Sequence, residues 1–355
     1  MRVISSFRQA CMTREILSLQ VIQCLLVVTV GVVLFLSMDG LQARTLDARE
    51  IAPGIFVWPG IQEEFSTHNH GHIANTGFIV GSELVAVIDT GSSYREGLAL
   101  RKMIREITQL PIGYVILTHM HPDHTLGAAA FRQDDPVFIG HEHLGDALAR
   151  RQSTYLNRMK QILGDMAEGT QIVFPSQSVS VDQVKRLDLG GRSLHLHAYP
   201  TAHTNNDLSV YDDKTGTLWL SDLLFVERLP VVDGSLLGWL KVIQKLSRQA
   251  CVTVSSDDAK NRSTAVETEA KGQCGKVKRI VPGHGSVTTQ WQSALATQQR
   301  YLEIIAADIR AIIKKGGTIT QAVESVGLEE KDNWLLFNEF HGRNVTAVFA
   351  ELEWE

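Results

Sequence analysis

The feature that most constrains this chain is a run of potential metal ligands at positions 118–124, which reads Thr-His-Met-His-Pro-Asp-His. Three imidazoles and a carboxylate so close together are costly to bury unless a cation or a hydrogen-bond network compensates them. The run directly follows an apolar strand predicted at 114–117, and binding sites collect in loops at such strand ends. We therefore expect a metal site that includes His119, His121, Asp123 and His124.

Three further candidate ligands follow at other predicted strand ends: His203, Asp222 and His284. Each lies beside Gly, Pro, Ser or Thr, which are typical loop residues. Imidazole and carboxylate ligands suit zinc, although iron and manganese accept the same donors. The residues alone therefore indicate a metal site without identifying the metal.

Short β segments alternate with amphipathic helices along the rest of the chain. The mixture of hairpin-like and crossover connections predicts an α/β fold with two sheets rather than one parallel sheet. Strands are predicted at 55–58, 76–80, 84–89, 114–117, 136–139, 184–187, 193–198, 208–211, 217–220 and 279–281, and helices at 96–108, 143–165 and 291–315.

The first 43 residues differ from the rest, because three arginines precede an apolar run at about 21–38. This layout is typical of an export signal, which we expect to be cleaved near Ala43. The apolar run approaches the length of a membrane span, so a retained anchor is the alternative. Only Cys251 and Cys274 would remain after cleavage, either paired or as free thiols. They lie in a polar stretch at about 247–275, which predicts an exposed insertion.

The net charge of −5 provides no basic field for binding nucleic acid. Near the C-terminus, apolar residues with helical spacing predict one or two helices that cover the sheet rather than a cofactor site. These residues are Trp334, Phe337, Phe340, Val345, Phe349, Leu352 and Trp354.

The HxHxDH motif, followed in order by the later His, Asp and His, resembles the metallo-β-lactamase superfamily. The resemblance implies an αββα sandwich of two mixed sheets flanked by helices, formed by residues 44–355 as a single domain. It also implies that Asp89 supports the metal loop from behind, although a turn-forming aspartate before glycine is the alternative. As implied ligands, His119, His121 and His203 bind one metal, Asp123, His124 and His284 bind the other, and Asp222 bridges them.

The resemblance further implies a hydrolase with two Zn²⁺ ions, for which iron or manganese is the alternative. A hydroxide shared by the two metals would attack an ester, thioester, lactone or amide. Asp123 would be the catalytic residue that orients this nucleophile or accepts its proton. A bridging Asp222 is more similar to the thioester and general hydrolase branch than to the antibiotic-degrading groups.

Several further stretches resemble periplasmic zinc metallohydrolases that accompany quinoprotein dehydrogenase systems and are related to a sulfur-oxidation-associated hydrolase. This resemblance implies a periplasmic location, a small-molecule substrate and a link to such a dehydrogenase, and the insertion at 247–275 departs from it. The stretches are 77–80, 87–91, 201–208, 221–226, 233–236, 299–303 and 343–355.

Two other functions remain open at this point. One is an iron-dependent oxidoreductase of the same fold. His121 argues against it, because the flavodiiron branch places Glu at this position. The other is a non-catalytic accessory protein that binds a quinone cofactor or a metal.

The remaining histidines carry weaker interpretations. His195 and His197 share one strand face, which we interpret as an outward polar face. His141 and His143 are ambiguous in the same way. His68, His70 and His72 resemble a substrate-facing hairpin of relatives or form a solvated polar turn, and we do not expect them to be ligands.

Overall fold

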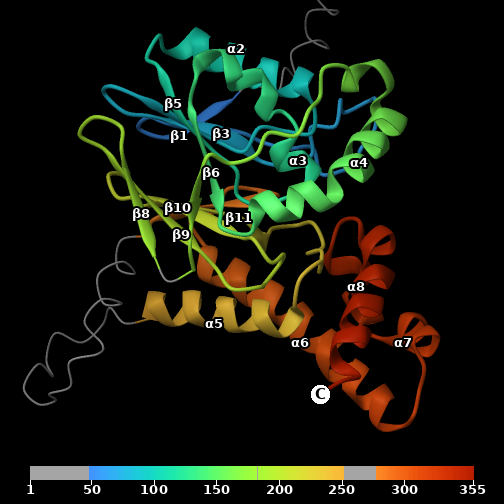
Figure 1. Cartoon of the computed structure of the whole chain (residues 1–355). Coiled ribbons are helices and arrows are strands. Elements are labelled where there is room, and N and C mark those ends of the chain that lie inside the picture. The colour runs from blue at the N-terminus through green and yellow to red at the C-terminus, as the bar shows by residue number, and fades with distance from the viewer. Residues whose placement is uncertain (1–47, 182, 252–276) are drawn as a thin grey trace, which may run out of the picture. The chain divides into compact units, whose positions relative to one another are not determined.

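A computed structural model of the chain describes residues 48–181, 183–251 and 277–355. These residues form two β-sheets packed face to face, with helices on both outer faces (Figure 1). The predicted α/β class and αββα sandwich are confirmed. The predicted export signal or anchor lies outside the described residues. Within the described part of the chain, no helix is both long and apolar enough to cross a membrane.

The first sheet has seven strands in chain order. The strands β1 to β4 pair antiparallel, and β4 to β7 pair parallel. The sheet is therefore mixed, as expected. Its strands are β1 (Arg49–Ala52), β2 (Ile55–Trp58), β3 (Thr76–Val80), β4 (Val85–Ile88), β5 (Ile112–Ile116), β6 (Val137–His141) and β7 (Gln177–Val179).

The second sheet has five strands in the order β12-β11-β10-β9-β8. All neighbours pair antiparallel except β11 and β12, which are parallel. This sheet is mixed as well. Its strands are β8 (Val184–Asp188), β9 (Ser193–Ala198), β10 (Leu208–Asp212), β11 (Thr217–Phe225) and β12 (Arg279–His284).

Helices cover both sheets. Figure 1 places α2 and α4 on the outer side of the first sheet and α5 and α6 on the outer side of the second. The α-helices are α2 (Tyr94–Ile107), α3 (Pro122–Thr125), α4 (Leu144–Leu163), α5 (Leu236–Cys251), α6 (Trp291–Lys314), α7 (Ile319–Ser325) and α8 (Phe337–Leu352), and the 3₁₀ helices are η1 (Ala128–Asp134), η2 (Gly164–Ala167) and η5 (Leu328–Asn333).

Three apolar clusters hold the layers together. One lies between the two sheets and includes Ile88 and Leu196, and the other two lie between each sheet and its helices. The helix α2 illustrates the local pattern: Ser93 caps it by accepting a hydrogen bond from the backbone N–H of Glu96, and Leu100 lies on its buried face. Burial of apolar faces therefore places the strand ends that carry the candidate ligands.

Three sequence predictions need correction. The helix α5 continues to Cys251, so residues 247–251 of the predicted insertion are helical, while 252–275 and Cys274 lie outside the described residues. The C-terminal helix α8 packs mainly on α6 and α7 rather than on a sheet, and its apolar residues belong to the same core cluster as those of β11. Trp354 was expected on the buried side but is 85% exposed, because it follows the end of α8. The other six apolar residues predicted there are buried.

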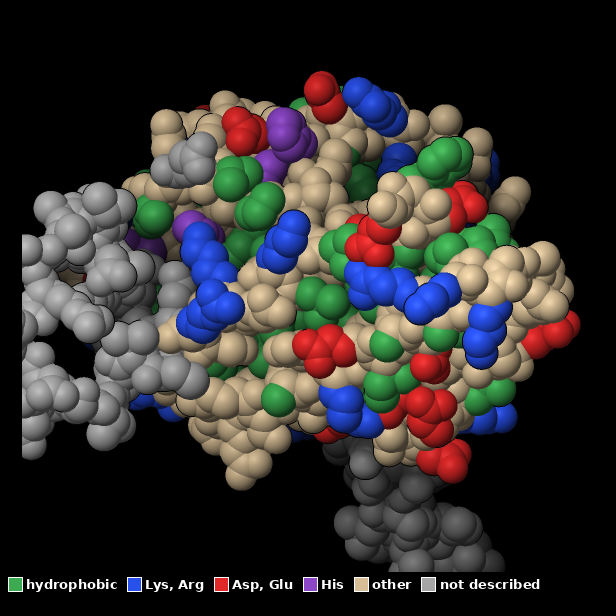
Figure 2. Space-filling view, turned by 90° about the horizontal axis from the view of Figure 1, so that it is seen from below, with side chains coloured by type: hydrophobic (Ala, Val, Ile, Leu, Met, Phe, Trp, Pro, Cys, Tyr) green, Lys and Arg blue, Asp and Glu red, His purple; other side chains and the backbone are tan. Residues whose placement is uncertain are grey.

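The surface that carries α5 and α6 shows no concentration of one charge. In Figure 2, Lys and Arg side chains lie among Asp and Glu side chains, with apolar side chains between them. This drawn face therefore offers no continuous basic tract of the kind that binds a phosphate backbone.

Candidate metal centre

All seven predicted ligands converge at one edge of the sandwich. His119 and His121 are in the loop after β5, and Asp123 and His124 are in the short helix α3. The other three ligands come from the second sheet: His203 follows β9, Asp222 is within β11, and His284 ends β12. Both sheets therefore contribute to the same cluster.

The ligand atoms form two groups. In the first, the side chains of His119, His121, His203 and Asp222 place their ligand atoms within 4.8 Å of one another. The Nδ1 atom of His121 lies 3.1 Å from Nε2 of both His119 and His203. This group contains the three histidines that the resemblance assigns to one metal.

The second group consists of Asp123, His124 and His284. Asp123 Oδ2 lies 3.4 Å from His284 Nε2 and 3.7 Å from His124 Nε2. Asp222 lies between the groups: its Oδ2 is 3.3 Å from His203 Nε2, and its Oδ1 is 3.2 Å from His124 Nε2. The structure therefore places Asp222 where a bridging ligand would be.

Four of the five imidazoles are oriented by a hydrogen bond at the ring nitrogen that faces away from the cluster. His203 Nδ1 and His284 Nδ1 donate to the carbonyl oxygens of Val231 and Ile73, at 2.7 and 2.8 Å. His124 Nδ1 donates to Asp89 at 2.7 Å, and His121 Nε2 donates to Asp233 at 3.0 Å. In a neutral imidazole the other nitrogen then carries a lone pair, and in all four rings this nitrogen faces the cluster.

The fifth imidazole follows the same arrangement. Thr118 Oγ1 donates to Asp89 Oδ2 at 2.8 Å, so it can accept a hydrogen bond from His119 Nδ1 at 3.2 Å. This leaves a lone pair on His119 Nε2, inside the cluster.

A cation fits this arrangement better than hydrogen bonding does. Facing lone pairs, such as those of His119 Nε2 and His121 Nδ1, repel each other when no proton lies between them. His124 Nε2 and Asp222 Oδ1 are buried and lie 3.2 Å apart, but neither forms a hydrogen bond of acceptable geometry with the other or with any other described residue. Buried polar atoms of this kind require a compensating partner, and divalent metal ions supply one to imidazole and carboxylate donors.

The charge states of the carboxylates also suit metal binding. Burial raises the pKa of Asp123 and Asp222, but neighbouring imidazoles, His124 first, outweigh burial and lower both below their ordinary values. Both are therefore ionised at neutral pH. Burial, together with His124, lowers the pKa of His119 well below its ordinary value, so this ligand is neutral. For His124, the carboxylates led by Asp222 outweigh burial and raise the pKa, and a metal would compete with that proton for Nε2.

Asp89 and Asp233 each accept a hydrogen bond from a candidate ligand imidazole, at the ring nitrogen that faces away from the cluster. Asp89 accepts hydrogen bonds from the backbone N–H of Thr118 and from His124 Nδ1, which is the contact expected of a residue that braces the metal loop. No role for Asp233 was predicted from the sequence. Its position five residues before a helical glycine-tryptophan pair carries no metal-site signal, and only the fold brings it to His121.

The remaining histidines lie outside both ligand groups. His72 is buried, pairs with Glu96 at 2.8 Å and stacks on Trp58, so the solvated turn proposed for it is wrong. The partner that keeps His72 buried, Glu96, lies 24 residues further along the chain and was not recognised from the sequence. His141 is also buried, with its Nε2 3.1 Å from the carbonyl oxygen of Tyr199.

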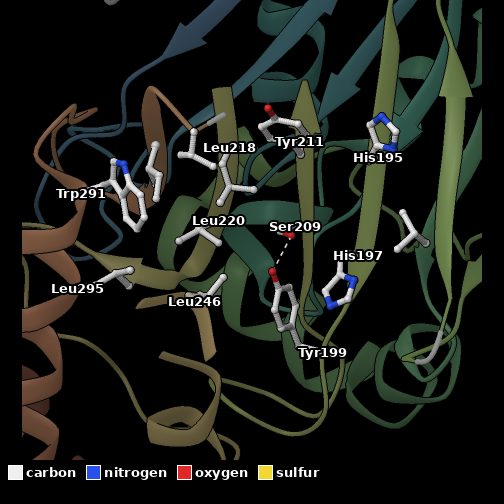
Figure 3. A pocket seen from close by; sticks show the side chains of 13 residues that line it. His195, His197, Tyr199, Ser209, Tyr211, Leu218, Leu220, Leu246, Trp291 and Leu295 are labelled. Carbon is white, nitrogen blue, oxygen red and sulfur yellow. Dashed lines mark hydrogen bonds between the residues drawn. The ribbon is translucent and has the colours of Figure 1, made fainter. Parts of the chain in front are cut away.

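His195 and His197 share one face of β9, as predicted, but this face is not simply open to solvent. Figure 3 shows both side chains at a pocket between the second sheet and the helices α5 and α6. Tyr199 and Ser209 line the same pocket and are joined by a hydrogen bond of 3.0 Å. Burial, with a contribution from Lys245, lowers the pKa of His197 to about 4.

Comparison with known proteins gives the family. A family model described as the metallo-beta-lactamase superfamily matches residues 70–296, which is more than half of the chain. The chain belongs to this superfamily. The matched region contains all seven candidate ligands.

Solved structures support the superfamily fold. A metallo-beta-lactamase from Pontibacter korlensis is 18% identical, with a TM-score of 0.53, and the alignment covers 73% of this chain and 99% of that one. The TMB-1 structure is 17% identical, with a TM-score of 0.51 over 73% of this chain and 97% of that one. At such identities the similarity concerns the fold alone.

A curated protein with similar sequence is a diflavin flavoprotein of Nostoc sp. It is 28% identical over 149 residues, which is 41% of this chain. The chain spans only 22% of the length of that protein.

Proposed function

We propose that this superfamily member is a dinuclear zinc hydrolase that acts on an ester, thioester, lactone or amide. The observation that carries the proposal is the convergence of five imidazole nitrogens and two carboxylates, with Asp222 between the two groups. The donor set contains no thiolate, so it resembles sites that hold two hydrolytic metals through nitrogen and oxygen ligands.

Two bound zinc ions would supply a nucleophile at neutral pH, by lowering the pKa of a shared water, and would polarise the substrate carbonyl. The protein contributes position and proton transfer. Asp123 lines the pocket beside the ligand cluster, so its carboxylate would orient the attacking water and accept its proton. Phe65, Tyr155 and Phe225 line the same pocket and would exclude bulk water from the reacting carbonyl.

The experiment combines metal analysis with a substrate screen on the purified protein. We expect about two equivalents of zinc by mass spectrometry, and hydrolysis within a panel of thioester, lactone, ester, amide, phosphodiester and β-lactam substrates. Asp222→Ala should lose both metals and the activity, while Asp332→Ala, which changes an exposed aspartate of η5, should keep both. A stable protein that binds no metal, or that binds two zinc ions and hydrolyses nothing in the panel, would contradict the proposal.

Redox chemistry with iron is the competing function, and the partial similarity to a flavoprotein is the observation that favours it. One or more equivalents of iron, with oxygen uptake and no hydrolysis, would replace the hydrolase by an oxidoreductase. If Asp222→Ala abolished metal binding but left the cellular role intact, a non-catalytic accessory role would replace both.

We further propose that the chain is exported to the periplasm and acts with a quinoprotein dehydrogenase system. The support is the arginine-led apolar segment at 1–43 and the resemblance of the mature chain to hydrolases of such systems. Cell fractionation, with mass measurement of the mature N-terminus, tests export and cleavage near Ala43. A full-length protein in the membrane fraction would indicate a retained anchor instead.

A further inference from the structure

The pocket above the candidate metal centre is rich in arginine. Arg151 and Arg158 come from α4, Arg228 from the segment after β11, and Arg343 from α8. Apart from the two carboxylates of the ligand set, the pocket wall includes only two acidic residues, Glu64 and Asp233.

Arg228 is the most unusual of the four, because it is a buried cation without a carboxylate partner. It is 4% exposed, and it forms no ion pair with any described residue. Its Nε atom is buried and has no hydrogen-bond partner in the part of the chain that the structure describes. Its Nη1 atom lies 3.0 Å from His284 Nδ1, and in the tautomer in which this nitrogen donates to the carbonyl oxygen of Ile73 it cannot also accept from Arg228.

Arg343 and Arg228 both contact the ring of Phe340. The guanidinium carbon of Arg228 is 5.2 Å from the ring centroid of Phe340, and that of Arg343 is 5.8 Å from the same centroid. Arg343 is exposed and makes no ion pair within the described part of the chain. The ring face compensates these cations only in part, since a cation–π contact is weak beside a charge-assisted hydrogen bond.

The acidic residues of the pocket compensate Arg228 only in part, because burial lowers its pKa despite the attraction of Asp123, Asp222 and Glu64. Asp233 already contacts His121 at 3.0 Å and Arg151 at 3.5 Å. Glu64 is exposed and forms no ion pair with a described residue. A buried cation with unused donors is costly unless a partner arrives from outside the chain.

We propose that Arg228 and Arg343 bind an oxyanionic group of the substrate, a carboxylate or a phosphate, while the scissile carbonyl lies at the metal centre. The inference rests on the proposed function. Guanidinium groups match both oxyanions through paired N–H donors, and the pocket joins these arginines to Asp123 and Asp222. The pair therefore determines specificity for an acyl compound with a negatively charged group away from the reacting bond.

A matched pair of thioesters tests the inference by kinetics. The purified metal-loaded protein is assayed with 3-(acetylthio)propanoate and with its uncharged amide, 3-(acetylthio)propanamide. We expect the kcat/KM ratio of acid to amide to fall about 10- to 100-fold in Arg343→Ala and in Arg228→Lys, as expected when a charge-assisted hydrogen bond is lost. Arg343 is exposed, so its variant remains folded even if changes at Arg228 disturb His284.

Arg95→Ala is the control variant, since Arg95 is exposed on α2 and does not line the pocket. It should leave the acid-to-amide ratio unchanged. A wild-type ratio near one, or an unchanged ratio in Arg343→Ala and Arg228→Lys, would overturn the inference. An equal fall in the Arg95 variant would assign the effect to overall charge and would overturn it as well.

Binding without turnover separates this inference from the proposed function. Calorimetry measures the affinity of 5-oxohexanoate, in which a methylene replaces the thioester sulfur, and of 5-oxohexanamide. We expect the anion to bind at least about tenfold more tightly, and this preference to disappear in Arg343→Ala. Preferential binding without hydrolysis of any thioester would support the anion site while contradicting the hydrolase. Hydrolysis without any charge preference in binding would support the hydrolase while contradicting the anion site.

The corresponding phosphonate, 4-oxopentylphosphonate, distinguishes the two oxyanions. A higher arginine-dependent affinity than that of 5-oxohexanoate assigns the site to phosphate esters, and a lower one assigns it to carboxylates. If both bind as weakly as the amide, the inference is wrong.

Discussion

Asp89 shows how one side chain can organise the candidate metal loop. Its backbone has a positive φ of 55°, and both of its carboxylate oxygens face the loop at 118–124. One oxygen accepts from the backbone N–H of Thr118, and the other accepts from Thr118 Oγ1 and His124 Nδ1. The carboxylate therefore holds the loop backbone and orients an imidazole ligand at the same time.

Asp89→Asn should lower the zinc affinity about 10- to 100-fold, the usual cost of losing a group that orients a metal ligand. Asparagine tolerates a positive φ and keeps the size of the side chain, so the change isolates the charge. Competition with a chromophoric chelator measures the affinity. Asp135→Asn, at an exposed position with a φ of 49°, is the control and should leave it unchanged. Equal affinities of the wild type and Asp89→Asn would contradict a supporting role.

His197 provides a prediction on pH dependence. Burial lowers its pKa to about 4 in the folded chain, whereas an unfolded histidine titrates near 6.5. Between these values the unfolded chain takes up the proton first, so the contribution of His197 to the free energy of unfolding is present above about pH 6.5 and falls as pH decreases toward about 4.

His197→Gln should therefore lose less stability than the wild type between about pH 7 and pH 4.5. Urea unfolding at several pH values measures the difference. His68→Gln, which changes an exposed histidine, should follow the wild type. Identical pH slopes of the wild type and His197→Gln would show that burial of this ring does not shift its titration.

At the scale of elements, the middle of β11 is irregular where it carries the bridging candidate. Ser221 has a positive φ of 49°, and the ladder between β11 and β12 shifts register at this residue. Gly283 in β12 lies against Asp222, and a Cβ atom at this glycine would overlap Asp222 Oδ1. The absence of a side chain at Gly283 therefore leaves room for the carboxylate between the two ligand groups.

Gly283→Ala should displace Asp222 and reduce both zinc content and hydrolysis. A displacement of about 1 Å can lower the rate about 100-fold. Metal analysis and kcat measure the two effects. Gly145→Ala, where no described atom lies within 4 Å of the added atom, is the matched control in α4 and should keep both. Full zinc content and full activity in Gly283→Ala would show that this close approach does not position Asp222.

At the scale of the whole molecule, the C-terminal helix holds the segment that follows β11. Asn344 Oδ1 accepts from the backbone N–H of Val232, and its Nδ2 donates to the carbonyl oxygen of Pro230. Between these two residues lies Val231, whose carbonyl oxygen orients His203. A helix more than a hundred residues away in sequence therefore supports a candidate ligand.

Asn344→Ala should lower the free energy of unfolding by about 2–4 kcal/mol, because two buried backbone groups lose their partner. Urea unfolding measures the change. Asn338→Ala, at an exposed position of α8, should change it by less than about 0.5 kcal/mol. A similar small effect for Asn344→Ala would mean that water replaces the asparagine.

The pattern of apolar and polar residues in the sequence was sufficient to predict much of this architecture. The strands at Ile55–Trp58, Thr76–Val80 and Ser193–Ala198 were predicted with the bounds that the structure has. The strands β1 and β7 were missed, because they are short and mostly exposed and so lack a regular apolar alternation. Trp354 was misplaced because helical spacing cannot indicate where a helix ends.

The seven candidate ligands could be selected from sequence, since clustered imidazoles and carboxylates after apolar strands are a local signal. Asp233, Arg228 and Arg343 could not, because single charged residues carry no spacing pattern. They reach the pocket only when β11, α4 and α8 pack around it. Local residue order thus specifies which side chains can bind metal, whereas long-range packing decides which charges surround them, since electrostatic partners depend on distance in space.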